Sequence, residues 1–211
     1  MIKKKSISEN VLRRLPKYYR ILQELEHENV KKISSTVISK MLNFTASQVR
    51  QDLSNFGEFG HQGYGYDVVY LKEQINNILG LNRIHNVIVV GGGRIGQALA
   101  NYRGFKEEGF AVLAVFDIKT EGINVGEGIK VLKMSQLEAY LKQNYVEVCI
   151  IATQKEVAKD VADQVKALGI KAFWNFAPCD LLLGEDVVVE NINMSESLFM
   201  LAYKYKNINK E

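Results

Sequence analysis

Three glycines follow a strongly apolar run in the middle of the chain and could form a phosphate-binding turn. Residues 87–90 are Val, Ile, Val and Val, a pattern typical of a buried strand. Gly91, Gly93 and Gly96 follow with the spacing G-x-G-x-x-G, and residues 97–100 favour a helix. Such glycines permit a tight turn, let a pyrophosphate approach the backbone, and let helix and strand pack closely. We therefore expect phosphate contacts from Gly91, Gly92, Gly93, Arg94, Ile95 and Gly96.

An acidic residue ends the next predicted strand. Residues 112–116 are apolar, and Asp117 follows them about 20 residues after Gly96, the spacing of a carboxylate that accepts the ribose hydroxyls of a dinucleotide. Such a carboxylate would repel a 2′-phosphate, so NAD(H) is favoured over NADP(H). Lys119 lies close by and weakens that preference. Strand, glycines, helix, strand and acid in this order predict a Rossmann NAD(H)-binding domain.

The alternation of strands and helices continues beyond Asp117 and predicts a doubly wound parallel sheet. We expect helices at 135–143 and 157–168 and strands at 146–152, 172–175 and 187–190. Ligands of such sheets bind at the carboxyl ends of the strands. Thr153, Asn175 and Phe176 follow or end strands, so we expect them to line the cofactor crevice.

The predicted cofactor domain lacks an obvious reacting group. No His follows His85, and no Ser or Tyr paired with Lys stands at a strand end. A cofactor site without a proton donor suggests that NAD(H) is sensed rather than consumed, with no catalytic residue. A small NAD(H)-dependent reductase or Rossmann-domain oxidoreductase subunit remains the alternative. His, Cys and carboxylate residues show no metal-ligand spacing, so we expect no metal.

Composition is that of a globular protein. The 211 residues are 47% hydrophobic and 24% charged, with a net charge of +3. No apolar run approaches the ~20 residues that span a bilayer, so we expect a cytoplasmic protein. Cys149 and Cys179 are then expected to be structural thiols rather than a disulfide.

The first 80 residues have a helical pattern. Apolar residues recur from Val11 to Leu25, interrupted by Pro16, which predicts a kink or a second helix with Pro16 in its first turn. A helix at 35–42 should bury Val37, Ile38, Met41 and Leu42. A capping box from Thr45 to Gln48 starts the next helix, which runs to about residue 55 and turns Val49 and Leu53 inward.

Two short helices with outward polar residues on the second describe a helix-turn-helix, here at about 17–56. Arg can bind guanine through two hydrogen bonds, and Gln can bind adenine in the same way. The residues expected to contact DNA from this helix are Gln48, Arg50, Gln51 and Ser54. Glycines and aromatic residues alternate over 57–68, which predicts a hairpin wing that adds His61, Gln62 and Tyr64. A three-helix packing module without a DNA partner remains the alternative.

The chain ends in a predicted helix capped by Ser195. Leu198, Leu201, Ala202 and Tyr205 would form one apolar face of it.

Taken together, these segments resemble the Rex family of redox-sensing transcriptional repressors over nearly the whole chain. The matching segments are residues 15–20 (LPKYYR), 48–57 (QVRQDLSNFG), 63–66 (GYGY), 91–96, 116–117, 175–178 (NFAP) and 189–192 (VENI). The resemblance implies a winged-helix DNA-binding domain (1–80), a Rossmann domain (81–193) and a swapped dimerisation helix (194–211).

The resemblance also implies a mechanism. A homodimer binds an inverted-repeat operator in double-stranded DNA, NADH releases it, and NAD+ competes but permits binding. Tyr102 and Phe176 would lie near the nicotinamide, and Arg20 would couple the domains. Family members commonly carry Asp at the position of Asn193, where it can pair with the residue matching Arg20. Because Asn193 is neutral, we expect weaker or different discrimination between NADH and NAD+.

Overall fold

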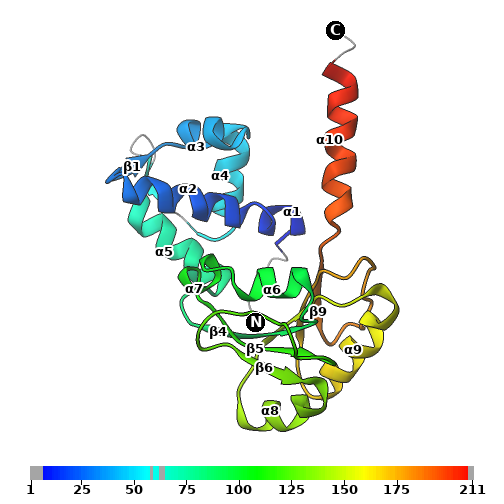
Figure 1. The fold of residues 1–211 in the computed structure, drawn as a ribbon. Coiled ribbons are helices and arrows are strands. Elements are labelled where there is room, and N and C mark those ends of the chain that lie inside the picture. Colours follow the sequence, from blue (N-terminus) through cyan, green and yellow to red (C-terminus); the bar gives the residue numbers. More distant parts are fainter. Residues whose placement is uncertain (1–6, 58, 62–64, 209–211) are drawn as a thin grey trace. The chain divides into compact units, whose positions relative to one another are not determined.

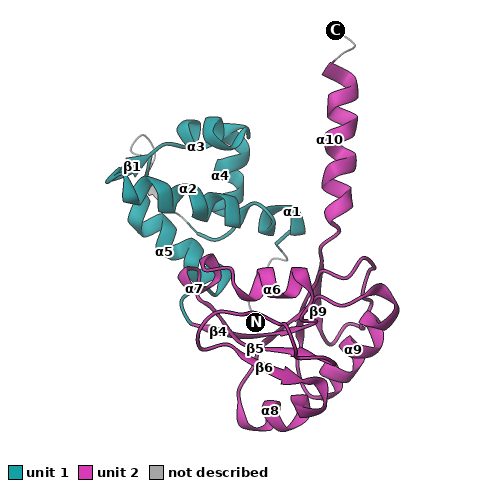
Figure 2. Ribbon diagram, viewed as in Figure 1, with its two compact units in different colours: residues 1–83 teal, residues 84–211 magenta. Residues whose placement is uncertain are grey.

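A computed structural model describes residues 7–57, 59–61 and 65–208 of the chain. It divides into two compact units, residues 1–83 and residues 84–211 (Figure 2). The expected domain boundary at residue 80 lies three residues before this division. Each unit has a separate hydrophobic core, so each is described here by itself.

Unit 1 contains short helices and a small antiparallel sheet (Figure 1). The helices are α1 (Glu9–Leu12), α2 (Leu15–His27), α3 (Ser35–Leu42), α4 (Ala46–Ser54) and α5 (Val68–Leu79). The strands β1 (Lys32–Ile33), β2 (Gly60–His61) and β3 (Gly65–Asp67) have the order β1-β3-β2. Pro16 lies in the first turn of α2, so the second of the two alternatives is correct: a new helix starts there.

Side-chain caps set where the helices of unit 1 begin. The Ser34 hydroxyl accepts from the Val37 amide, that of Thr45 from the Gln48 amide, and the Asp67 carboxylate from the Tyr70 amide. Each such cap stabilises a helix by about 1 kcal/mol. The Thr45 half of the expected capping box is confirmed. It fixes the start of α4, the second helix of the helix-turn-helix.

Burial on α3 differs from the expectation. Ile38 is buried, but Val37 and Met41 are each 47% exposed. Val37 and Met41 are four residues apart and share a helical face, and that face points away from the core that Ile38 joins. The prediction that both are buried is therefore wrong. In α4, Val49 and Leu53 are buried as expected.

Unit 2 is built on a six-stranded parallel sheet with the order β6-β5-β4-β7-β8-β9. Its strands are β4 (His85–Val90), β5 (Phe110–Asp117), β6 (Lys130–Lys133), β7 (Val148–Ile151), β8 (Ala172–Asn175) and β9 (Val188–Asn191). Chain order reverses between the neighbours β4 and β7, as in a doubly wound sheet. The predicted parallel sheet is confirmed. The short edge strand β6 was not predicted, because it holds only two apolar residues between lysines.

Helices cover both faces of this sheet (Figure 1). They are α6 (Arg94–Ala100), α7 (Gly104–Glu107), α8 (Leu137–Gln143), which follows a short 3-10 turn, and α9 (Lys155–Ala167). Alternate residues of β4 enter two separate clusters. Ile88 and Val90 pack with Leu137 of α8, whereas Val87 and Val89 pack with Ala100 of α6.

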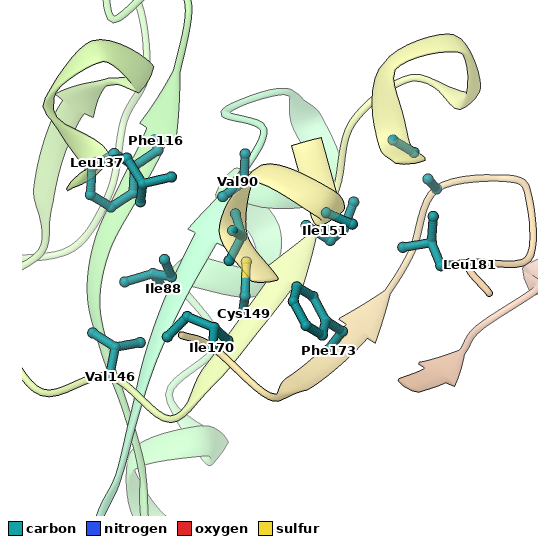
Figure 3. Packing of buried hydrophobic residues seen from close by; sticks show 14 of the residues in the cluster. Ile88, Val90, Phe116, Leu137, Val146, Cys149, Ile151, Ile170, Phe173 and Leu181 are labelled. Carbon is teal, nitrogen blue, oxygen red and sulfur yellow. The ribbon is translucent and has the colours of Figure 1, made fainter. Parts of the chain in front are cut away.

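The first of these clusters contains Cys149 (Figure 3). Its side chain lies among Ile88, Phe173 and their neighbours, and burial raises the pKa of the thiol. Both cysteines are free, as expected. A fully buried, protonated thiol is a packing group rather than a nucleophile.

The last helix, α10, runs from Met194 to Ile208 and none of its residues is buried. It begins two residues earlier than expected, because its cap is Asn193 rather than Ser195. The Asn193 Oδ1 atom accepts a hydrogen bond from the Ser195 amide at 3.1 Å. Among the described helices none is long and apolar enough to cross a membrane.

Candidate ligand pocket and DNA-binding surface

The glycine-rich turn lies between the end of β4 and the start of α6, as the spacing predicts. Gly91 has φ +105°, and a Cβ there would lie 2.4 Å from the carbonyl oxygen of Ala152. A Cβ at Gly96 would lie 1.8 Å from the carbonyl oxygen of Gly91. Nothing lies within 4 Å of the Cβ position of Gly93, so this side of the turn is open to a ligand.

Asp117 lies at the carboxyl end of β5, next to this turn. Its carboxylate accepts hydrogen bonds from the Gly92 amide at 2.6 Å and from the Lys119 amide at 3.0 Å. These contacts fix the carboxylate at the edge of the turn. The side chains of Arg94 and Lys119 are exposed around it, and Ile95 is 38% exposed.

A cavity of about 540 Å³ opens at the carboxyl ends of these strands. It is lined by Gly91, Gly93, Asp117, Thr153 and residues of α9, among others. The Thr153 Oγ1 atom is buried and has no hydrogen-bond partner within the described part of the chain. A buried hydroxyl without a partner is costly, and a polar ligand would satisfy it. A cavity of this size suits a small-molecule cofactor, so the residues present fit part of a dinucleotide.

Aromatic rings line up on the other face of the sheet. Tyr102 packs against Phe105, Phe105 against Trp174, and Trp174 against Phe176, with centroids 4.8, 5.6 and 4.6 Å apart. Tyr102 is 60% exposed, so it offers a ring surface to solvent. The two residues expected near a nicotinamide, Tyr102 and Phe176, are thus the two ends of one aromatic row.

Asn175 differs from the other expected ligand residues because its side chain is fully buried. Its Nδ2 atom donates to the Cys179 carbonyl and to Asn191 Oδ1, and its Oδ1 atom accepts from the Ala177 amide. These bonds use both of its N–H groups. The side chain therefore holds the chain around Phe176 in place rather than offering a free group to a ligand.

The polar face of α4 carries the expected DNA-binding residues. Arg50, Gln51 and Ser54 are exposed and Gln48 is half-buried. Arg50 Nη1 donates to the Ser35 hydroxyl at 3.1 Å, an exposed contact that DNA could replace. His61 lies in β2, paired with Gly65 of β3, which forms the expected hairpin. Gln62 and Tyr64 lie outside the described residues.

A buried ion pair behind this face was not predicted. Asp52 accepts from Arg14 Nε at 2.6 Å, from Arg14 Nη2 at 2.8 Å and from the Tyr18 hydroxyl at 2.7 Å. The hydrogen bond to Asp52 raises the pKa of Arg14. The pKa of Tyr18 is raised mainly by burial and further by its hydrogen bond to Asp52. The signal in the sequence was the position of Asp52, three residues after the inward-facing Val49.

The two residues expected to form a switch lie in different units. Arg20 is exposed on α2 of unit 1, and Asn193 precedes α10 in unit 2. In the part of the chain that is described, no group of three or more His, Cys, Asp or Glu could hold a metal ion.

Known proteins match nearly the whole chain. A family model described as "Putative DNA-binding protein N-terminus" matches residues 6–54, and one described as "CoA binding domain" matches residues 82–179. The redox-sensing transcriptional repressor Rex of Clostridioides difficile (strain 630) is 46% identical over 208 residues, which are 98% of this chain and 99% of that protein. The Rex protein of Clostridium botulinum (strain Hall) is 51% identical over 95% of this chain and 96% of its own. The chain belongs to the Rex family.

Solved structures agree with this assignment. The crystal structure of RSP, a Rex-family repressor, in complex with β-NAD+ and operator DNA matches with a TM-score of 0.88 and 41% identity, over 97% of this chain and 98% of that one. RSP in complex with β-NADH matches with the same TM-score and 39% identity, over 97% of each chain. This Rex protein is therefore a redox-sensing transcriptional repressor with an N-terminal DNA-binding domain and a Rossmann domain. The reductase and the packing module without a DNA partner are set aside.

Proposed function

We propose that this Rex protein binds an inverted-repeat operator as a homodimer and leaves it when NADH occupies the cavity in unit 2. The observation that carries this proposal is the buried hydroxyl of Thr153, which has no hydrogen-bond partner among the described residues and lies in a cavity beside the glycine-rich turn. Two solved Rex-family complexes, one with β-NAD+ and operator DNA and one with β-NADH, support it.

The glycine-rich turn and the cavity beside it support an assignment of the residues that would hold the dinucleotide. Backbone N–H groups of Gly93, Arg94, Ile95 and Gly96 would bind the pyrophosphate, and Asp117 with Lys119 beside it would bind the adenosine ribose. Gly91 and Gly92 would shape the turn that the pyrophosphate approaches, since their N–H groups already donate to Phe116 and Asp117. The Thr153 hydroxyl in the cavity wall would donate a hydrogen bond to the ligand or accept one from it. Tyr102 and Phe176 would lie near the nicotinamide, with Phe105 and Trp174 between them in the aromatic row. NADH would undergo no reaction at this site. It would act only through its charge and the state of its nicotinamide ring.

The DNA-binding residues would lie on one face of α4 and on the hairpin that follows. Once the Arg50 guanidinium releases the Ser35 hydroxyl, its N–H groups can form two hydrogen bonds with guanine. Gln48, Gln51 and Ser54 flank Arg50. His61, Gln62 and Tyr64 would form the wing. Asp52 does not contact DNA in this proposal, because Arg14 and Tyr18 occupy its carboxylate.

Release requires that the ligand binds the two states unequally. The extent to which NADH shifts the equilibrium away from the DNA-bound state is set by how much more tightly it binds the free state than the DNA-bound state. NAD+ would bind both states with similar affinity, so it would compete with NADH yet permit DNA binding. Arg20 and Asn193 would contribute to that difference. Such a regulator would work in the cytoplasm, together with its DNA.

The dimer would form through α10. This helix is apolar on several sides and entirely exposed in the single chain, which indicates that another chain covers it. A second copy is the partner that also supplies the twofold symmetry of an inverted repeat.

The test is fluorescence anisotropy on a labelled inverted-repeat operator, titrated with NADH and separately with NAD+. We expect release by NADH and little release by NAD+. The Thr153→Val substitution removes only the hydroxyl and should raise the NADH concentration for half-release about fivefold to tenfold, whereas Thr153→Ser should stay close to wild type. Tight operator binding indifferent to both nucleotides would contradict the proposal.

A further inference from the structure

Two asparagines meet at the carboxyl ends of the last two sheet strands. Asn175 ends β8 and Asn191 ends β9, and the two residues are register partners in this parallel pair. Partners in neighbouring strands point to the same face of a sheet. Their amides therefore meet, with Asn175 Nδ2 donating to Asn191 Oδ1 at 2.8 Å.

The same two amides hold the chain between the strands. Asn175 Nδ2 donates to the Cys179 carbonyl at 2.6 Å, and the Ala177 amide donates to Asn175 Oδ1 at 3.0 Å. The Leu181 amide donates to Asn191 Oδ1 at 3.0 Å. The segment 176–181 is thus bound at both ends by one buried side-chain network.

This network lies between two functional parts of unit 2. On one side it borders Phe176, whose ring packs on Trp174. On the other side, the Ile192 amide donates to the Asn175 carbonyl at 2.8 Å, and the next residue, Asn193, caps α10. Only one residue separates Asn191 from that cap.

We propose that Asn175 and Asn191 form an asparagine clamp that transmits ligand binding at Phe176 to the base of α10. Asn191 acts as a positioning residue: it contacts no ligand, and it fixes segment 176–181 to β9. The inference rests on the proposed function, since it needs a ligand that changes DNA binding.

The physical reason is that the clamp allows segment 176–181 little independent movement. Both N–H groups of Asn175 are used, and Asn191 Oδ1 accepts two bonds, so segment 176–181 cannot shift alone without leaving a buried polar group unpaired. A displacement of Phe176 by a nicotinamide ring is therefore passed to β9 and the residues that follow it.

Three substitutions separate the clamp from general packing. Asn191→Leu has a similar size and removes the acceptor of both bonds. Asn191→Asp keeps the side-chain oxygen that accepts both bonds and should preserve the clamp. Val188→Ala, at a 73% exposed position of the same strand, is the control outside it. If Asn191→Leu does not fold, as judged by circular dichroism, Asn191→Gln replaces it, because its oxygen is displaced by one methylene.

The experiment measures NADH affinity with and without operator DNA. Trp174 is the single tryptophan of the chain and lies beside Phe176, so energy transfer from it to NADH reports binding directly. Coupling is the ratio of the two dissociation constants, and it is reciprocal between ligand and DNA. We expect Asn191→Leu to reduce this ratio at least about fivefold, with Asn191→Asp and Val188→Ala within about twofold of wild type.

The outcomes are distinct. A ratio of one in the wild type would overturn the proposed function itself. A wild-type ratio well above one that Asn191→Leu leaves unchanged would overturn the clamp alone. A loss of coupling in Val188→Ala as large as in Asn191→Leu would also overturn it, because packing of β9 would then suffice.

Discussion

At the residue scale, the least expected feature of unit 1 is a carboxylate inside the DNA-binding domain. Asp52 is 2% exposed and lies on α4. Its carboxylate accepts hydrogen bonds from Tyr18 of α2 and from Arg14, the residue before α2. Arg14 also lies over the ring of Phe44, 5.9 Å from its centroid. The ion pair therefore fixes α4 against α2 and the residue before it, while Arg50 on α4 is exposed.

Asp52→Asn should destabilise unit 1 because it leaves the charge of Arg14 without its carboxylate. Breaking one partner of a buried pair costs about 3 kcal/mol or more. We expect a lower midpoint in urea unfolding and weaker operator binding, since α4 loses its fixed position. Ser54→Ala, at an exposed position of the same helix, should leave the midpoint unchanged. Equal midpoints for Asp52→Asn and wild type would contradict this role.

Asn193 is the second residue whose side chain we expect to affect function. Its side-chain oxygen caps α10, and an aspartate would cap the same amide equally well. Asn193→Asp therefore changes charge while leaving the helix start intact.

We expect Asn193→Asp to sharpen the discrimination between NADH and NAD+. In the proposed switch, a carboxylate at position 193 would form a charged hydrogen bond with Arg20, worth ~1.5–3 kcal/mol against ~1 for the amide. The measurement is operator release by each nucleotide. Thermal unfolding should stay within a degree or two of wild type, which separates the effect from stability. Identical NADH to NAD+ selectivity in both proteins would count against the hypothesis.

At the element scale, α10 stands out because its apolar residues surround the helix. Leu198, Phe199 and Leu201 are 62%, 68% and 61% exposed, and Tyr205 is 67% exposed. A helix that is apolar on several sides is stable in water only when other elements cover it. The other described helices of 12 residues or more, α2, α5 and α9, each contain buried residues.

Deletion of residues 195–211 should convert the dimer to a monomer. Each large apolar side chain buried in an interface contributes about 1.5–3 kcal/mol, so losing the whole helix removes most of the association energy. Sedimentation velocity measures the result. Lys206→Gln, which changes only one charge near the helix end, should remain dimeric. A truncated chain that stays dimeric would show that the interface lies elsewhere.

At the scale of the whole molecule, two units with separate cores must share one response. Unit 1 buries residues such as Leu15, Leu22 and Leu71, and unit 2 has two clusters on the faces of its sheet. Neither core needs side chains from the other. The coupling between ligand and DNA is therefore a property of the assembly rather than of either unit.

Residues 84–211 alone should fold, form a dimer and bind NADH, because the sheet, the cavity and α10 all belong to this unit. They should not bind the operator, since α4 and the hairpin belong to unit 1. Isothermal titration calorimetry with NADH and anisotropy with the operator test both expectations. Failure of this segment to bind NADH would place part of the ligand site in unit 1.

The sequence predicts the local features well. The strand before Gly91, the start of α4 at the Thr45 cap and the helix that follows Pro16 depend on residues close together in the chain. The partners of Asp52 and Asn175 could not be predicted in the same way, because Arg14 is 38 residues from the first and Asn191 is 16 residues from the second. Val37 and Met41 were misplaced for a related reason: apolar character does not say which face of a helix the neighbouring helices cover.

The sequence alone determined the two functional regions, since a glycine-rich turn after a strand and a capped polar helix are set by local backbone chemistry. It also determined the family, through segments spread along the whole chain. Only the tertiary structure decided which polar groups are occupied and which are free. Asn175 is bound internally, whereas the Thr153 hydroxyl has no partner among the residues that the structure describes. That difference arises because the packing of strands distant in sequence decides which hydrogen-bond partners meet.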